Sequence, residues 1–385
     1  MNDSMPRIMR EPAYPAARTV AARVEQHFRR HASSNGGAED APAPSLDDIE
    51  LLVDVAFWAS LRREEGFSPK ISMAYLPAEP GNGAMVFRNR LALTPSILAK
   101  LAPAVERPGI HLGIWRQDGD LALWGSTRTL PPFCFVLEVV GPGVLVIKHR
   151  RREESGKFTN VVVLEGDTVK FVNEQRPRLG DCQSMSTALL GFFNHEPAPA
   201  SIDYMVELAT SMRAHGRGGT LLVVPDGKDT WLDSMLQPIA YAVSPPYSGL
   251  RELVRGGAAN GLEDRRWLIS VRRAVDGIAG LTAVDGATVV SSEYDLLAFG
   301  AKISRRTGCE RVEQVIVTEP IEGASASVAH PSQLGGTRHL SAAQFAHDQH
   351  DAVALVASQD GRFTIFTWSE CDQAVLAHRA ESLLL

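Results

Sequence analysis

The sequence predicts two domains: a β-rich α+β domain, followed by an α/β domain whose mixed sheet is flanked by helices. Two observations lead to this prediction. Between about residues 70 and 172, short apolar runs alternate with turn signals at regular spacing, which is typical of consecutive strands. From about residue 190, strand-like runs alternate with segments of helical periodicity, which is typical of a mixed sheet with helices packed on it. A length of 385 residues fits two domains.

The domain boundaries follow from changes in composition along the chain. Residues 1–45 are expected to form a flexible N-terminal arm and linker, because residues 33–45 are rich in Gly, Ala, Pro and Ser. Residues 46–180 are expected to form the β-rich domain. Residues 190–385 are expected to form the α/β domain.

Helix and strand signals define the elements of the N-terminal part. A short helix is expected within the arm at 16–31. Ser45 is expected to cap the next helix, with Asp48 completing a capping box. A further helix is expected from Pro95, because proline is favoured at the first helical position. Strands are expected at 71–76, 110–115, 121–124, 134–140, 144–148, 160–164 and 168–172.

The C-terminal part alternates between the two periodicities. Amphipathic helices are expected at 201–214 and 266–278. The run 219–224 is continuously apolar, which indicates a strand buried on both faces of a sheet. Ser369 is expected to cap a final helix. Further strands are expected at 283–290, 296–303, 312–318, 352–357 and 363–367.

Composition excludes several classes of protein. The formal net charge of -6 argues against a general nucleic-acid binder, which usually has a basic surplus. No apolar run reaches the length of a transmembrane helix, so no membrane association is expected. The four cysteines are widely spaced and form no C-x-x-C pair, which fits a reducing cytoplasm. A cytoplasmic location is therefore expected. No P-loop motif is present, which excludes a P-loop ATPase.

Two segments near the C-terminus carry residues suited to a nucleotide polyphosphate. Asp285 supplies a carboxylate for a divalent metal, and Gly286 and Ala287 leave room for a nucleotide beside it. Taken alone, Asp-Gly is also a common turn dipeptide.

The second segment brings several phosphate-binding groups together. Gly336 permits a tight turn, and Thr337 supplies a hydroxyl and a backbone N–H. Arg338 supplies a planar guanidinium that matches phosphate, and His339 can donate to phosphate or bind a metal. A solvated loop is the alternative interpretation of this segment.

In order and spacing, these segments resemble the DGA and RHR motifs of the diadenylate cyclase (DAC, DisA_N-type) domain. The resemblance implies a nucleotidyltransferase that condenses two ATP into cyclic di-AMP with release of pyrophosphate. It implies a divalent metal, Mg²⁺ or Mn²⁺, bound by Asp285 and His339, with Asp285, Arg338 and His339 as catalytic residues. It also implies nucleotide contacts from Gly286, Ala287, Gly336, Thr337, Arg338 and Ser358, and a face-to-face homodimer during catalysis.

The chain departs from the family pattern at two positions. Leu340 stands where the family has a second arginine that helps to bind triphosphate. Gln359 stands where the family has a glutamate. Asp360 lies one residue further on, where strand alternation points it to the other face. These changes leave open a second hypothesis, a DAC-like domain that binds a nucleotide and has lost its chemistry.

The β-rich domain resembles the DACNV probable sensor module found before some DAC domains. Trp115 and the Trp124-Gly125 pair carry this resemblance. It implies that the N-terminal domain senses an input and regulates the C-terminal domain. A structural adaptor, whose β-rich module binds a partner protein, is a third hypothesis.

Overall fold

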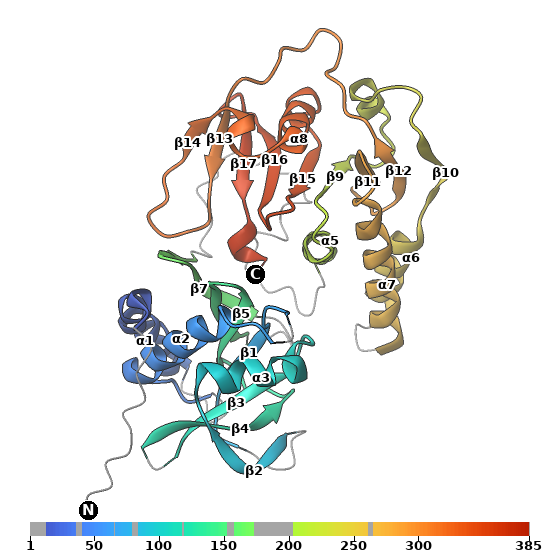
Figure 1. The fold of residues 1–385 in the computed structure, drawn as a ribbon. Coiled ribbons are helices and arrows are strands. Elements are labelled where there is room, and N and C mark those ends of the chain that lie inside the picture. The colour runs from blue at the N-terminus through green and yellow to red at the C-terminus, as the bar shows by residue number, and fades with distance from the viewer. Residues whose placement is uncertain are drawn as a thin grey trace, which may run out of the picture. The chain divides into compact units, whose positions relative to one another are not determined.

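The computed structural model describes residues 13–35, 41–64, 66–78, 84–117, 119–151, 158–172, 203–260 and 265–384. The chain divides into two compact units, one reaching to Val172 and one running from Asn173 to Leu384 (Figure 1). Each is a mixed α/β unit built on its own mixed sheet. The predicted boundary at 180–190 lies outside the described residues. No helix among the described residues is long and apolar enough to cross a bilayer.

The first unit contains an eight-stranded sheet with strand order β2-β4-β3-β1-β5-β6-β7-β8. β1 pairs with β3 in parallel, and the other pairs are antiparallel. Its elements are α1 (Pro15–Asn35), α2 (Leu46–Ser60), β1 (Ile71–Tyr75), β2 (Met85–Ala92), α3 (Pro95–Val105), β3 (His111–Gln117), β4 (Asp120–Thr127), β5 (Phe135–Gly141), β6 (Val144–Arg150), β7 (Phe158–Glu165) and β8 (Thr168–Phe171).

Helix α1 packs into the core of the first unit, so the expectation of a loosely attached arm is wrong for Pro15–Asn35. The stripe of Val20, Val24 and Phe28 is buried in the same cluster as α2 and the sheet. Tyr14 also stacks on Phe57 of α2, with ring centroids 3.7 Å apart. Burial of this apolar stripe stabilises the helix on the sheet, although the segment that follows it is rich in Gly, Ala, Pro and Ser.

The predicted capping box at the start of α2 is confirmed. The Ser45 hydroxyl accepts from the Asp48 N–H, and the Asp48 carboxylate accepts from the Ser45 N–H. The same buried carboxylate also binds Arg116, with Nη2 2.7 Å and Nε 3.1 Å away, and the Tyr75 hydroxyl at 3.1 Å. One carboxylate therefore ties α2 to strands β1 and β3.

The second unit contains a nine-stranded sheet with strand order β10-β12-β11-β9-β15-β16-β17-β13-β14. Its elements are α5 (Tyr204–Ala214), β9 (Gly219–Val224), a 3-10 turn (Thr230–Ser234), β10 (Tyr241–Tyr247), α6 (Gly249–Asn260), α7 (Arg265–Leu281), β11 (Ala287–Ser291), β12 (Leu296–Ala301), β13 (Val315–Thr318), β14 (Ser327–Ala329), a 3-10 turn (Pro331–Gln333), α8 (Thr337–Asp348), β15 (Val353–Ala357), β16 (Phe363–Ser369), β17 (Ala374–Arg379) and a 3-10 turn (Glu381–Leu383).

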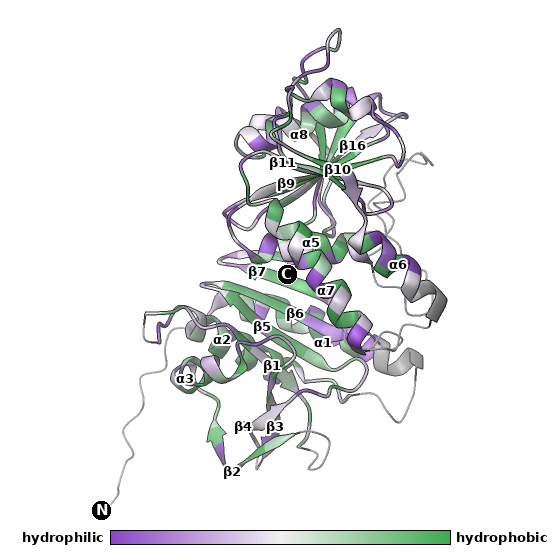
Figure 2. Ribbon diagram, turned by 90° about the vertical axis from the view of Figure 1, so that its right-hand side faces the viewer, coloured by the Kyte–Doolittle hydropathy of each residue, from purple (hydrophilic) through white to green (hydrophobic). Residues whose placement is uncertain are grey.

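Strand β9 lies at the centre of this sheet and is buried on both faces, as its apolar run predicts. Leu221 and Val223 pack against α5 and α7, whereas Leu222 and Val224 pack against α8. The strands are hydrophobic along most of their length, and the helices lie on both sides of them (Figure 2). The directions in which β11 and β15 pair with β9 decide which strand ends meet at each edge of the sheet.

Two expectations about the C-terminal region are wrong. The predicted final helix after Ser369 is instead a turn followed by β17, in which Val375 and Ala377 are buried. Cys371 is disulfide-bonded, whereas Cys134 and Cys309 are free thiols. The expectation of a reducing environment, in which cysteines stay as thiols, is therefore not met at Cys371.

Candidate functional site

The predicted site residues gather at one edge of the second sheet. Strands β9 and β11 are parallel and begin at this edge, and β15 is antiparallel to β9 and ends there. The register pairs Thr220 with both Ala287 and Val356. Asp285 and Gly286 directly precede β11, and Ser358 directly follows β15. The fold therefore brings together segments that are far apart in the sequence.

Arg338 joins this group from the first turn of α8. A Cβ built on Gly218, just before β9, would lie 3.0 Å from the Arg338 guanidinium and 3.2 Å from the Ala357 carbonyl. Gly218 has a φ of +71°, so its backbone conformation also favours glycine. The Arg338 guanidinium forms no hydrogen bond or ion pair with any other described residue. It is available to an anion.

The N-terminus of α8 lies beside that guanidinium and has no side-chain cap from the described residues. Its N-cap is Gly336, which has no side chain to accept from the first N–H groups. The 12 residues of α8 add a helix dipole whose positive end lies here. Thr337 is the first helical residue and is exposed. This arrangement is typical of a phosphate site.

His339 lies beneath this turn rather than at its surface. Its side chain is 2% exposed, and its ring meets Phe366 edge-on at 6.1 Å between centroids. A Cβ on Gly335 would lie 2.3 Å from its Nδ1 atom, so the ring needs glycine at that position. Burial lowers the pKa of His339, which keeps the imidazole neutral. Its Nε2 atom is buried without a hydrogen-bond partner among the described residues.

Asp285 is the exposed carboxylate of the site. Its side chain is 92% exposed, and its Oδ2 atom lies 2.6 Å from Nζ of Lys302. The hydrogen bond and charge of Lys302 lower the pKa of Asp285, and the more distant charge of Arg338 lowers it further. The carboxylate is therefore ionised at neutral pH. The sequence motifs did not identify Lys302 as a residue of the site.

Among the described residues at this edge, Asp285 is the side chain suited to bind a divalent metal. Asp285 is an exposed carboxylate, and Mg²⁺ commonly takes one or two carboxylates together with substrate phosphates. Among the described residues, no group of three or more His, Cys, Asp or Glu side chains is arranged to hold a metal. The residues present fit a metal that arrives with a polyphosphate and do not form a closed protein cage.

Gly286 and Ala287 have structural roles in the strand pair β11–β12 and in the core. Gly286 has a φ of +122°, and a Cβ there would lie 2.5 Å from the carbonyl carbon of Gly300. Strands β11 and β12 therefore approach closely at this point, and only glycine fits. Ala287 is 1% exposed and belongs to the core on the α8 face, so its side chain does not face a ligand.

The β15–β16 turn is fixed to the last turn of α5 and to the loop that follows this helix. Its Gly361 carbonyl accepts from Nε of Arg213 at 2.9 Å, and the Gln359 amide donates to the Arg217 carbonyl at 3.3 Å. Asp360 lies in this turn and pairs with Arg362 at 3.3 Å, so the strand alternation expected for it does not apply. The half-buried Ser358 starts the turn.

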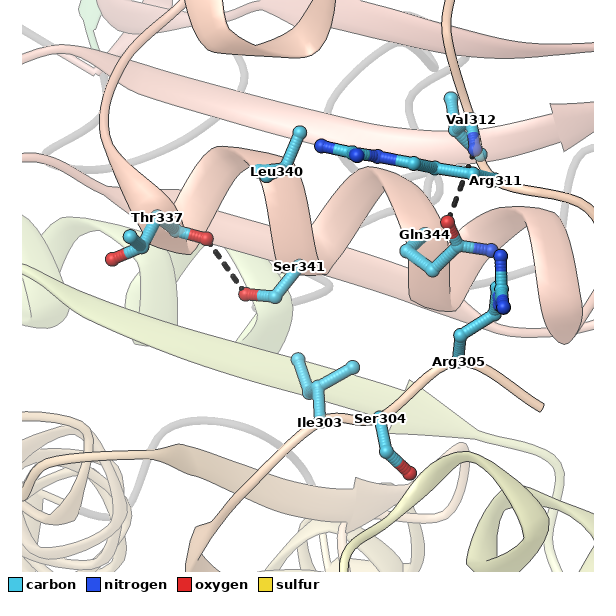
Figure 3. A pocket seen from close by; sticks show the side chains of 9 residues that line it. All are labelled: Ile303, Ser304, Arg305, Arg311, Val312, Thr337, Leu340, Ser341 and Gln344. Carbon is cyan, nitrogen blue, oxygen red and sulfur yellow. Dashed lines mark hydrogen bonds between the residues drawn. The ribbon is translucent and has the colours of Figure 1, made fainter.

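A cavity of about 430 Å³ lies beside the first two turns of α8 (Figure 3). Arg311 extends across α8 toward Leu340, and Gln344 holds the segment before β13 by accepting from the Val312 N–H at 3.0 Å. Thr337, Leu340, Ser341 and Gln344 are spaced as one helical face. The sequence patterns predicted no helix at 337–348, so they could not predict a cavity lined by one face of that helix. The lining residues are Ile303, Ser304, Arg305, Arg311, Val312, Thr337, Leu340, Ser341 and Gln344.

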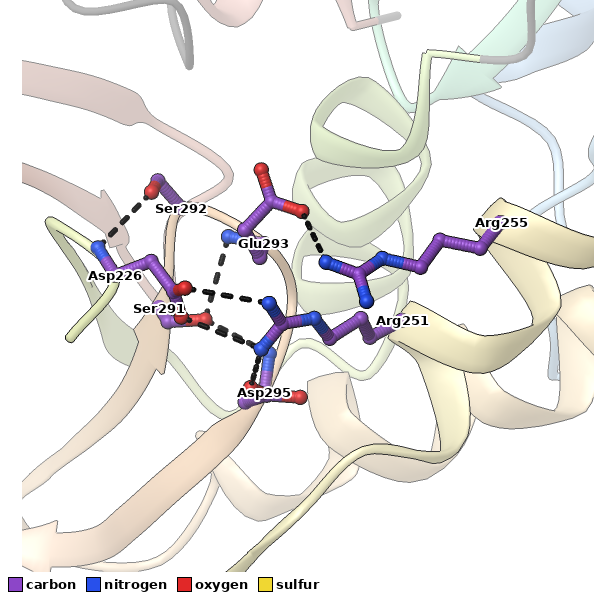
Figure 4. A network of polar contacts seen from close by, with 7 residues as sticks. All are labelled: Asp226, Arg251, Arg255, Ser291, Ser292, Glu293 and Asp295. Carbon is purple, nitrogen blue, oxygen red and sulfur yellow. Dashed lines mark hydrogen bonds and ion pairs between the residues drawn. The ribbon is translucent and has the colours of Figure 1, made fainter. Parts of the chain in front are cut away.

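A second polar network lies at the opposite edge, where β9 and β11 end (Figure 4). Arg251 of α6 pairs with Asp226, 3.2 Å away, and with Asp295. Arg255 pairs with Glu293 at 3.3 Å. Each guanidinium in this network already has a carboxylate partner. The network therefore attaches α6 to the sheet, whereas Arg338 at the first edge has no such partner among the described residues.

In the first unit, the tryptophan pattern has a packing role. Trp124 is buried, and its indole N–H donates to the Leu76 carbonyl at 2.8 Å. A Cβ on Gly113 would lie 2.0 Å from this indole, and a Cβ on Gly125 would lie 2.0 Å from the Met85 carbonyl oxygen. Gly113 therefore makes room for the indole, and Gly125 lets the backbones of β4 and β2 approach closely beside it.

Residues 38–128 match a family model described as "Probable sensor domain DACNV". The matched region covers α2, α3 and β1 to β4 of the first unit and includes the Trp124 packing site. The match ends before the second unit. Within the first unit, this region is therefore similar to the DACNV family of probable sensor domains. No curated protein matches the chain.

Proposed function

We propose that the second unit is a nucleotidyltransferase domain of diadenylate cyclase type, regulated by the first unit as its sensor. Its reaction would condense two ATP into cyclic di-AMP and release two pyrophosphates. One observation supports this most strongly: the edge of the sheet that carries Asp285 also receives the uncapped N-terminus of α8 and the available guanidinium of Arg338. A carboxylate, a guanidinium and helix N–H groups together suit a nucleotide polyphosphate.

The cavity beside α8 suits the base and ribose of the same nucleotide. It shares Thr337 with the phosphate-binding turn, and its volume of about 430 Å³ lies within the usual range for small-ligand sites. The walls from Ile303 and Val312 are apolar, which favours a planar base. Leu340 lies one helical turn after Thr337, on the side of the cavity nearer to the phosphate-binding turn. Ser341 and Gln344 supply polar groups for its edges. ATP is therefore proposed to lie along the first turns of α8.

Cyclisation needs two such sites facing each other. The 3′-oxygen of each ATP would attack the α-phosphorus of the other, and the bond from that phosphorus to the bridging oxygen would break. Each hydroxyl proton would pass to water, because the lowered pKa of Asp285 makes its carboxylate a weak proton acceptor. A face-to-face homodimer would supply the second site, and positioning the two nucleotides would lower the barrier.

Asp285 would hold Mg²⁺ or Mn²⁺ together with oxygens of the substrate. When bound, the metal would neutralise charge on the polyphosphate. His339 is assigned to supporting the turn that carries Arg338, because its ring is buried.

The test is a product assay with the full-length protein. ATP or GTP would be supplied with Mg²⁺ or Mn²⁺, and the products would be identified by mass spectrometry. We expect cyclic di-AMP and pyrophosphate, and we expect no product from Asp285→Asn. Asp351→Asn is the matched control, because Asp351 is also an exposed aspartate, paired with Lys228 at 2.7 Å. Undiminished product from Asp285→Asn would remove Asp285 from the site.

Nucleotide binding without turnover is the second candidate function. It is favoured by Leu340, which forms an apolar wall of the cavity, and by Gln359, whose amide is engaged by the Arg217 carbonyl. Under this function, ATP binds and no cyclic product forms. Leu340→Arg would then raise ATP affinity by restoring a phosphate contact. A folded Leu340→Arg variant with unchanged affinity would indicate that the phosphates lie elsewhere.

A further inference from the structure

A lysine stands against the carboxylate that would hold the metal. Nζ of Lys302 lies 2.6 Å from Oδ2 of Asp285. Lys302 directly follows β12, and Asp285 lies two residues before β11 in the paired strand. The pairing of Ala287 with Ala301 makes the two positions neighbours across the strand pair. The close approach of Gly286 to Gly300 brings the two backbones nearer at the same point.

The backbone that carries Lys302 is held on its other side as well. The Lys302 carbonyl accepts from the Leu236 N–H at 2.8 Å. Met235 and Ile303 form an antiparallel bridge, and the Ser304 N–H donates to the Ser234 carbonyl at 2.9 Å. Lys302 therefore projects from a segment that is anchored by β11 on one side and by residues 234–236 on the other. The backbone at Lys302 is therefore fixed, and this holds the ammonium group beside Asp285.

We propose that Lys302 lets this site bind a nucleoside triphosphate without a divalent metal. The inference rests on the proposed function, because it assumes that ATP phosphates lie beside Asp285 and Arg338. In the protein alone, the ammonium group neutralises Asp285. When a triphosphate binds, the ammonium group donates to a phosphate oxygen and lies between the two anions, which is the position a metal ion takes in a metal-dependent site.

The exposure of the pair makes this exchange feasible. Lys302 is 49% exposed and Asp285 is 92% exposed, so their mutual attraction is screened by water and is weak. A triphosphate carries more charge than one carboxylate and therefore attracts the ammonium group more strongly. A divalent metal at Asp285 must displace the same ammonium group. Lys302 should therefore favour metal-free ATP binding and oppose metal binding.

The experiment measures ATP binding by isothermal titration calorimetry, once in EDTA and once in Mg²⁺. The full-length protein is compared with Lys302→Met, which retains the unbranched side chain and removes the charge. We expect the unmodified protein to bind ATP in EDTA within a few-fold of its affinity in Mg²⁺. Lys302→Met should weaken binding in EDTA by about tenfold or more, the size expected for a lost charge-assisted hydrogen bond.

Direct titration of Mn²⁺ by electron paramagnetic resonance, with ATP present, gives a second measurement. Lys302→Met should bind Mn²⁺ several-fold more tightly, because the competing ammonium group is gone. Lys228→Met is the matched control, since Lys228 forms an exposed pair with Asp351 at 2.7 Å at the other end of β9. This control should alter neither measurement.

Three results would overturn the inference, and they differ in what else they overturn. ATP binding that requires Mg²⁺ in the unmodified protein would refute the role of Lys302 and leave the proposed function standing. Absence of ATP binding under both conditions would refute the proposed function and the inference with it. Equal effects of Lys302→Met and Lys228→Met would also refute the inference, because only a general charge effect would remain.

Discussion

Gly286→Ala separates the structural role of this glycine from any contact with a nucleotide. A φ of +122° costs a non-glycine residue about 1–3 kcal/mol. The added Cβ would also lie 2.5 Å from the Gly300 carbonyl carbon, a backbone atom that moves only with β12. Such overpacking typically costs about 1–3 kcal/mol more. We therefore expect the second unit to lose roughly 2–6 kcal/mol of unfolding free energy.

Hydrogen exchange followed by mass spectrometry measures this loss within the second unit alone. Amides of β11 and β12 that open by global unfolding should exchange at least about 30-fold faster, the equivalent of 2 kcal/mol. Gly308→Ala is the matched control: its φ is +87°, and a Cβ there would meet no atom within 4 Å. It should cost about 1–2 kcal/mol. Equal losses in the two variants would show that contact with Gly300 does not constrain position 286.

Three further predictions concern the two units. Arg338→Ala should weaken ATP binding by about tenfold or more with little change in melting temperature, because its guanidinium has no partner among the described residues; calorimetry and thermal unfolding test both parts. Asp48→Ala should destabilise the first unit by about 3 kcal/mol, since it removes a helix cap and a bidentate arginine contact; unchanged denaturant unfolding would contradict this. Burial lowers the pKa of His111 to about 4, so only the unfolded chain takes up this proton between pH 6.5 and 4. Stability of the first unit should then fall by roughly 3 kcal/mol over that range, and His111→Asn should flatten the fall in a pH series of unfolding curves.

Sequence periodicity was sufficient for most strands and for the helices with a clear apolar stripe. It located β9 because both faces of that strand are apolar, and it located α2 because the Ser45 cap is a local signal. Helix α8 was missed as a helix. Three of its six buried residues are alanines and two more are polar, which gives little apolar contrast, and two glycines precede it.

The expected helix after Ser369 shows how a correct local signal can mislead. The Ser369 hydroxyl does accept from the Asp372 N–H at 3.2 Å, three residues on, as in a helix cap. The same bond also closes a turn. Gln373 then adopts a φ of +48°, and the chain returns as β17. Pairing of β17 with β16 and β13 decides the outcome, and that pairing is not encoded within the segment.

The sequence identified several residues of the candidate site, but it did not predict how they are arranged in space. The motifs indicated Asp285, Arg338 and Ser358, and the topology brings the segments that carry them to one edge of the sheet. Lys302 and Arg311 carried no motif, so only strand pairing and the path of the chain beside α8 reveal them. The placement of His339 was likewise set by packing against Gly335.

The central position of β9 has a consequence for how this protein folds. Its two partners, β11 and β15, are both distant in the sequence, so neither pairing can form through a short hairpin. Closing such long loops slows folding, and the chain must be largely synthesised before the second pairing is complete. Asp285 and Ser358 are attached to the ends of those partners. A partly folded second unit would therefore have no assembled site, and nucleotide binding would report completion of folding.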